Sequence, residues 1–234
     1  MMCHGSVGEE HMTWILFDWA GTVAFAISGA MVGLSRRMDI FGIVVLALLT
    51  AVGGGMARDV LAGITPPMAL VKPEDLLLSV VTALLVSLGY ELVRFTGERR
   101  RLFNTLYNVS DTVGLASFTV TGAMVGLSQG IGSPYVFPTM LGVITAVGGG
   151  IMRDLMAQRV PVVLHMDVYA VASLAGAVVM CYGWPRWGSE TASWVCFAIV
   201  IALRGLALHF GWQLYHPRPG YRFHHHKIRG WHRK

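Results

Sequence analysis

Residues 50–59 read TAVGGGMARD, and residues 145–154 read TAVGGGIMRD. A second matching pair precedes them, because residues 29–35 and residues 122–128 both read GAMVGLS. The earlier pair is offset by 93 residues and the later pair by 95, and the order of the two segments is the same. Matches of this length at nearly constant spacing indicate an internal duplication. The chain therefore holds one structural unit twice.

The composition places this unit in a membrane. Hydrophobic residues make up 54% of the 234 residues, and charged residues make up 13%, which is about half the charge of a soluble domain. Apolar runs long enough to cross about 30 Å of hydrocarbon predict seven transmembrane helices. These runs cover residues 13–34, 41–63, 75–95, 104–127, 135–157, 166–184 and 190–212.

Each copy of the unit holds three of the seven runs. An odd number of spans means that the second copy enters the membrane in the opposite orientation. We therefore predict an all-α membrane protein with two inverted three-helix repeats and a seventh helix. The expected parts are an extracytoplasmic segment at 1–12, repeat 1 at 13–95, repeat 2 at 104–184, the seventh helix at 190–212 and a basic cytoplasmic tail at 213–234.

The lysines and arginines predict the orientation. Thirteen of them fall in the loops and the tail on one side, and only Lys72 and Arg186 fall on the other. The remaining three, Arg58, Arg153 and Arg204, lie inside the predicted spans. Basic loops face the cytoplasm, so we expect a multi-pass protein of the cell (inner) membrane with its N-terminus outside and its C-terminus in the cytoplasm.

A run of three glycines lies in the second predicted helix and another in the fifth. A glycine inside a helix is destabilising by roughly 0.5–1 kcal/mol relative to alanine, so we interpret both runs as kinks or breaks that face the protein interior. A broken helix offers backbone groups to an ion or a polar solute; small residues also let two helices pack closely. The inverted positions favour the first interpretation. The residues are Gly53, Gly54, Gly55, Gly148, Gly149 and Gly150.

Charged residues inside the predicted spans suggest two ion pairs. An unpaired charge at mid-span costs about 2.5–3.5 kcal/mol on insertion scales. We predict that Asp18 pairs with Arg58 toward the outside and that Asp111 pairs with Arg153 toward the cytoplasm. These pairs either line a pathway or latch the helices together, and the sequence leaves both roles open.

Two further carboxylates follow the arginines directly, at Asp59 and Asp154. Neighbouring residues on a helix point about 100° apart, so we expect these carboxylates to bond elsewhere than to the adjacent arginines. They are then free to face the cavity, where negative charge attracts cations.

Basic residues outside the spans suggest contact with lipid headgroups. They are Arg99, Arg100 and Arg101 in a predicted loop, and the tail that contains residues 224–226, a run of three histidines. The three cysteines have no metal-ligand spacing, so no metal site is expected.

Two copies of Gly-Gly-Gly-x-x-Arg-Asp, each preceded by Gly-Ala-Met-Val-Gly, resemble the prokaryotic branch of the trimeric intracellular cation (TRIC) channel family. The resemblance covers about residues 14–212. It implies a homotrimer in which each subunit has its own hydrophilic pore, bounded by helices kinked at the two glycine triples. It also implies conduction of monovalent cations, chiefly potassium with sodium as the second candidate, and no cofactor.

The sequence also departs from the family pattern. Animal members carry Lys-Glu-Val on the fourth helix, linked to phosphoinositide interactions, whereas residues 107–111 here read YNVSD. We therefore do not expect phosphoinositide control. Some bacterial relatives are described as glycine permeases, so the alternative function is a secondary transporter of a small solute. An enzyme is not expected, because Ser35 and Ser128 have no His or Lys beside them in a span to activate a nucleophile, and neither is a nucleic-acid partner.

Overall fold

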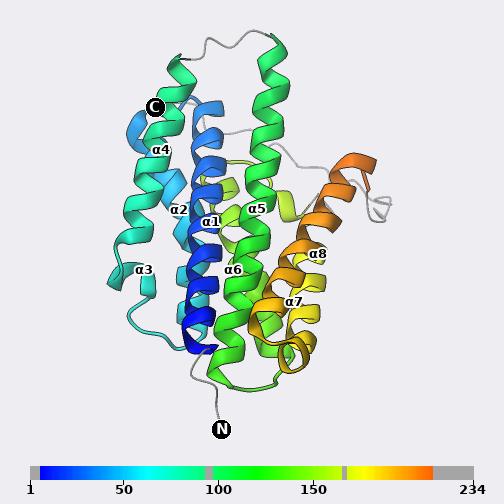
Figure 1. Ribbon diagram of the computed structural model, residues 1–234. Helices are drawn as coiled ribbons and strands as arrows, with labels where there is room; N and C mark the ends of the chain where they lie inside the picture. The colour runs from blue at the N-terminus through cyan, green and yellow to red at the C-terminus, as the bar shows by residue number, and fades with distance from the viewer. Residues whose placement is uncertain (1–5, 93–96, 165–167, 213–234) are drawn as a thin grey trace, which may run out of the picture.

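The computed structural model of the protein describes residues 6–92, 97–164 and 168–212. Over these residues the chain forms helices and no strand (Figure 1). Two short helices, α3 (Met68–Val71) and the 3-10 helix η1 (Val162–Leu164), follow α2 and α6. The long helices are α1 (Ser6–Ser35), α2 (Ile40–Leu61), α4 (Glu74–Leu92), α5 (Gly97–Gln129), α6 (Val136–Met156), α7 (Val168–Trp187) and α8 (Ser189–Phe210).

These long helices occupy the places of the predicted spans. Six of them, all except α5, are long and apolar enough to cross a membrane. α5 has 33 residues, but its composition is more polar than that of the other long helices. Its residues 110–126 are almost all buried, so this part of α5 contacts other helices and has no need of a lipid-compatible surface.

The two predicted repeats are visible as two matching sets of helices. The first set is α1, α2 and α4, with α3 before its last helix, and the second is α5, α6 and α7, with η1 before its last helix. α1 and α5, the first helices of the two sets, run in opposite directions (Figure 1). The short segments α3 and η1 were not expected from the sequence, which placed both stretches in loops.

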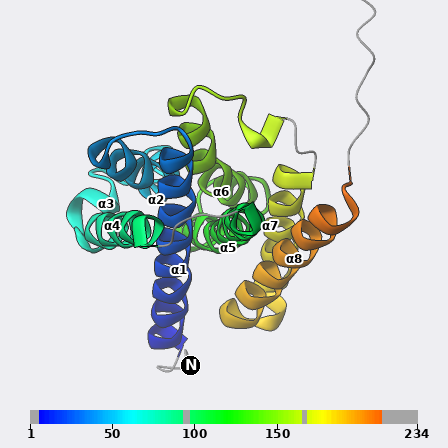
Figure 2. The same ribbon diagram turned by 90° about the horizontal axis from the view of Figure 1, so that it is seen from above.

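The centre of the bundle is built from the first two helices of each set. α1 packs on α2 and α5, and α6 packs on α2 and α5. α4 lies against α1 and α2, whereas α7 lies against α5 and α6, as the view from above shows (Figure 2). α8 stands outside the two sets and packs mainly on α7 and α5.

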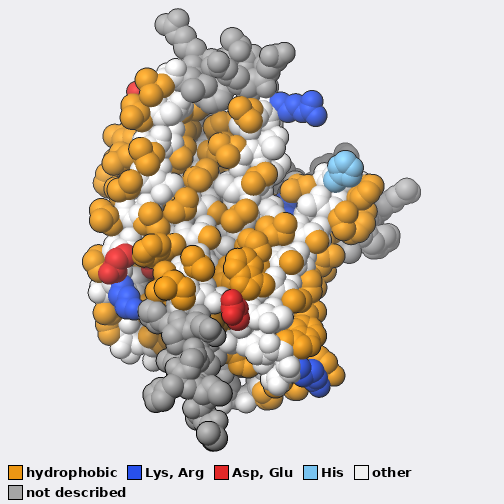
Figure 3. Space-filling view, viewed as in Figure 1, with side chains coloured by type: hydrophobic (Ala, Val, Ile, Leu, Met, Phe, Trp, Pro, Cys, Tyr) orange, Lys and Arg blue, Asp and Glu red, His pale blue; other side chains and the backbone are white. Residues whose placement is uncertain are grey.

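The surface fits a lipid environment. Hydrophobic side chains cover much of the visible face, and few charged side chains interrupt them (Figure 3). Large apolar side chains are exposed on several helices, among them Leu85 on α4 and Val178 on α7. In water such a surface would drive association, so the chain is an all-α membrane protein.

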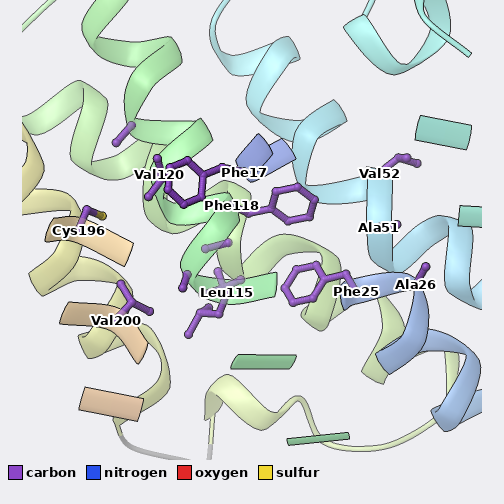
Figure 4. Close-up of a cluster of buried hydrophobic side chains, with 14 of the residues drawn as sticks. Phe17, Phe25, Ala26, Ala51, Val52, Leu115, Phe118, Val120, Cys196 and Val200 are labelled. Carbon is purple, nitrogen blue, oxygen red and sulfur yellow. The ribbon is translucent and has the colours of Figure 1, made fainter. Parts of the chain in front are cut away.

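Two aromatic rings meet at the centre of the bundle. Phe25 of α1 and Phe118 of α5 lie edge to face, with ring centroids 5.2 Å apart, and both are buried (Figure 4). Each ring also packs against a glycine of the other's helix, Gly114 for Phe25 and Gly21 for Phe118. The contact therefore has the same form from both repeats.

Candidate functional site

The glycine triples do not interrupt their helices. α2 runs without a gap from Ile40 to Leu61, and α6 runs from Val136 to Met156. The prediction of a helix break at each triple is therefore wrong, because the backbone hydrogen bonding continues through it. A bend without a break stays a prediction.

The triples instead mark the place where α2 and α6 touch. A Cβ atom added to Gly54 would overlap the carbonyl oxygen of Thr145, and one added to Gly149 would overlap the carbonyl oxygen of Thr50. Only a residue without a side chain permits such close approach of two backbones. The close-packing role that the sequence left open is thus present, because α2 and α6 meet at the glycine triples.

The second repeat gathers its charges into a closed group, which we call the Arg153 cluster: Ser28, Tyr107, Asp111, Arg153, Asp154 and Arg159. Arg153 is fully buried, and its Nη1 donates to Asp111 Oδ1 and to Ser28 Oγ. Ser28 in turn donates to Asp111 Oδ1 over 3.3 Å. The predicted ion pair between Asp111 and Arg153 is confirmed.

Asp154 belongs to the same cluster and is not free. Its Oδ1 accepts from Arg153 Nε at 2.9 Å and from Arg159 Nη2 at 2.6 Å, and its Oδ2 accepts from the backbone N–H of Val162 at the start of η1. The expectation that Asp154 bonds elsewhere than to Arg153 is therefore wrong. Arg159 also donates to the hydroxyl group of Tyr107 over 2.9 Å.

In the first repeat, Arg58 bonds to its own neighbour. Its Nε and Nη2 both lie near Asp59 Oδ1, at 2.9 Å and 2.8 Å, and Asp59 Oδ2 accepts from the backbone N–H of Met68 at the start of α3. The expectation for Asp59 is therefore also wrong. A long arginine side chain can fold along the helix surface, so the 100° between adjacent Cβ atoms does not separate the charged groups.

Asp18 has a different neighbour from the one predicted. None of the ion pairs in the described residues joins Asp18 to Arg58. The side chain of Asp18 instead contacts that of Asp75, the second residue of α4. Asp18 is 7% exposed, and Asp75 is half-buried.

A cavity lies between these groups. Its deep part is lined by Asp18, Thr22, Arg58 and Asp75, with Phe118 among the other lining residues. A wider part of about 130 Å³ continues past Trp14 and Asp18 toward Lys72 and Glu74. We call the two parts together the Arg58 cavity.

Sequence reasoning missed several members of these groups. Asp75 was placed at the start of the predicted run 75–95, and it does lie in the first turn of α4, but its contact with Asp18 was not expected. Ser28 and Tyr107 carry no charge, so neither stood out in an apolar run. The spacing along α1 could have pointed to Ser28 as an inward-facing residue, since Ser28 lies on the same face as Phe25, about one helical turn away.

The predicted headgroup residues are only partly described. Arg101 is exposed and lies within α5, not in a loop. The side chains of Arg99 and Arg100, and the tail with its three histidines, lie outside the described side chains.

Known proteins resemble this chain along most of its length. A family model described as "Glycine transporter" matches residues 15–91 and again residues 108–185, which is independent support for the duplication. The chain is 39% identical over 170 residues to a UPF0126 membrane protein of Deinococcus radiodurans, covering 72% of this chain and 74% of the relative. It is 36% identical over 193 residues to the UPF0126 inner membrane protein YadS of Escherichia coli, covering 82% and 89%.

Solved structures share the fold. The chain superposes on a prokaryotic TRIC channel crystallised in 0.5 M KCl with a TM-score of 0.79 at 31% identity, covering 87% of this chain and all of that one. It superposes on the TRIC orthologue from Rhodobacter sphaeroides with a TM-score of 0.77 at 34% identity, covering 85% and 98%.

A duplicated all-α membrane fold with buried charge clusters in both halves defines a protein of the channel and transporter class, and its structural neighbours form a channel family, not an enzyme family. The chain belongs to the prokaryotic TRIC channel family, whose sequence model also covers the UPF0126 membrane proteins. The resemblance stated from the glycine triples is thereby confirmed.

Proposed function

We propose that the protein is a homotrimeric channel for monovalent cations, chiefly potassium, with one pore in each subunit. The observation that carries the proposal is the likeness, at 31–34% identity and TM-scores of 0.76–0.79, to structures described as TRIC cation channels. At that level of identity the likeness indicates membership of the same family and not only a shared fold.

The pathway follows the four central helices. On α1, Asp18 and Thr22 line the Arg58 cavity, Phe25 contacts Phe118, and Ser28 joins the Arg153 cluster. One helix thus passes from one charged region to the other, with the pair of rings between them. In this proposal the ring pair and the contact between α2 and α6 separate the two halves of the pathway.

The membrane topology is part of the proposal. Seven spans, α5 included, place the N-terminus outside and the C-terminus in the cytoplasm, as the thirteen-to-two distribution of basic residues favours. The Arg58 cavity then opens to the outside, and the Arg153 cluster lies toward the cytoplasm.

Planar-bilayer recording of the purified protein under a potassium gradient tests the proposal. We expect single-channel currents that reverse near the potassium equilibrium potential. Currents that reverse near the chloride potential, or slow saturable uptake with no unitary currents, would contradict it. Crosslinking in the membrane tests the trimer separately, because conduction through single subunits would not depend on it.

A second candidate is a secondary transporter of a small solute such as glycine. The description of the matching family model favours it, and an inverted repeat suits a transporter as well as a channel. The two functions differ in turnover, so recording and uptake of labelled glycine on the same proteoliposomes separate them.

A further inference from the structure

Arg58 and Arg153, the arginines of the two Arg-Asp pairs, differ in which of their guanidinium nitrogens have hydrogen-bond partners. Arg58 is 4% exposed, its Nε and Nη2 are occupied by Asp59, and its Nη1 has no hydrogen-bond partner among the described residues. In Arg153 the Nη1 position is occupied by Asp111 and Ser28. Arg153 leaves only Nη2 without a partner, and its guanidinium group faces the Tyr107 ring with 5.2 Å to the centroid.

The guanidinium group of Arg58 borders a cavity. Asp18 corresponds to Asp111 in the repeat, but it lines the same cavity as Arg58 and contacts Asp75. The second residue of α7, which corresponds to Asp75 at the start of α4, is Tyr169. At this position the first repeat therefore carries a carboxyl group that lines a cavity, whereas the second repeat carries a buried tyrosine.

The walls of the Arg58 cavity have two chemical characters. One is the buried, positively charged N–H donor of Arg58, and such a group is costly to leave unsatisfied. The other is the pair of carboxyl groups of Asp18 and Asp75, with Trp14 also lining the cavity. Carboxylates and an aromatic ring are groups that bind an ammonium ion.

We propose that the Arg58 cavity binds a small zwitterion, an amino acid whose ammonium and carboxylate groups are one or two carbons apart. Its carboxylate accepts from Nη1 of Arg58, and its ammonium group lies beside the carboxyl groups of Asp18 and Asp75 and against Trp14. The proposal deepens the second candidate function by naming a binding site. It does not require transport, because binding is measured on the purified protein.

Simpler ligands bind only one of the two kinds of charged group that line this cavity. A metal cation or methylammonium would meet the carboxylates and leave the buried N–H of Arg58 without a partner. Acetate would meet Arg58 and face two carboxylates of like charge. The free space beside Arg58 is about 20 Å³, which is enough for about one water-sized group, so a bulky side chain on the amino acid is excluded from the deep part.

Isothermal titration of the purified full chain at constant KCl tests the site, with glycine as the probe and methylammonium and acetate as half-ligands. We expect glycine to bind at least about 10-fold more tightly than either half-ligand, because only glycine gains both charge-assisted contacts. Methylammonium binding as tightly as glycine would overturn the proposal and leave a simple cation site. An absence of glycine binding in protein that conducts potassium would overturn it too, without affecting the channel function.

Three variants assign the residues. Asp75→Asn and Arg58→Lys should each weaken glycine binding about 10-fold or more, since the lysine keeps a charge beside Asp59 but has no second nitrogen to reach the cavity. Glu190→Gln is the matched control: it removes an exposed acidic residue in the first turn of α8 and should leave binding unchanged. Glycine binding that survives Asp75→Asn in folded protein, judged by an unchanged melting temperature without ligand, would overturn the assignment.

Discussion

The Arg153 cluster and the Arg58 cavity are built on the same sequence motif, but the first is a closed side-chain network and the second contains open space. In the second repeat, one arginine binds side chains from α1, α5 and α6 and closes the space between them. In the first repeat, the one side chain that Arg58 bonds to within the described part of the chain is its neighbour Asp59, and Arg58 lines a cavity together with the corresponding aspartate. A duplicated backbone therefore does not duplicate a side-chain network. Each half can therefore differ through the positions where the two copies differ.

The largest expected effect is a loss of stability when the arginine of either repeat is replaced by leucine. Arg153→Leu removes the partner of two buried carboxylates, Asp111 and Asp154, and removing one partner from a buried pair costs about 3–5 kcal/mol. Arg58→Leu should cost less, because it removes a partner from Asp59 alone, and Asp59 keeps the backbone N–H of Met68, whereas Arg153→Leu also takes the ion-pair partner of Asp111. Thermal unfolding in detergent, measured side by side, checks the order. Equal losses would mean that the two halves are closed to the same degree.

A second test removes one hydroxyl group from the closed half. Ser28→Ala takes away the acceptor for Arg153 and the donor to Asp111, so we expect a loss of about 1.5–3 kcal/mol. Ser117→Ala is the matched control, because this serine on α5 is equally buried and its hydroxyl group has no partner among the described residues. Chemical denaturation should show Ser117→Ala as neutral or stabilising. Equal destabilisation by both changes would assign the loss to packing.

A third test concerns the contact that joins the two halves. Gly149→Ala forces a methyl group against the carbonyl oxygen of Thr50, and overpacking of this kind costs about 1–3 kcal/mol. Gly89→Ala on α4 is the control, since a Cβ atom there meets nothing within 4 Å and should stabilise the helix by roughly 0.5–1 kcal/mol. Melting temperatures in one detergent compare them. A harmless Gly149→Ala would show that α2 and α6 separate easily.

The smallest expected effect concerns conduction through the open half. Asp75→Asn removes a carboxylate from the lining of the Arg58 cavity and should lower the potassium conductance, on the order of two-fold at low ionic strength, because local negative charge concentrates cations. High salt should reduce the difference, since it screens the charge. Single-channel recording at two KCl concentrations measures this. Glu190→Gln, in the first turn of α8, should change neither value.

Much of the architecture could be read from the sequence because hydrophobic length and duplication are strong signals. Each of the seven long helices overlaps its predicted run, and this includes α5, although α5 is more polar than the other long helices. The short segments α3 and η1 gave no such signal. Four or fewer residues carry no measurable periodicity, and their positions depend on the carboxylates of Asp59 and Asp154, which accept from the backbone N–H groups at or near their starts.

The site was harder to predict than the fold. The Asp111–Arg153 pair was predicted from the cost of an unpaired charge in a membrane. That cost requires each arginine to have an acidic partner but does not say which one. It therefore could not decide between Asp18 and Asp59 for Arg58. The choice depends on side-chain reach and on the position of Asp75, neither of which is encoded in spacing along a single helix.

α8 has a consequence for assembly. In a subunit made only of two inverted repeats, the outer flanks formed by α4 and α7 would be equivalent, and such a subunit could associate through like faces. α8 covers α7, and in the described part of the chain no corresponding helix covers α4. The two flanks therefore present different surfaces, which is the requirement for a head-to-tail contact that closes into a ring. A single helix added to a duplicated unit thus gives the subunit two unlike flanks, and so a direction of contact around the ring.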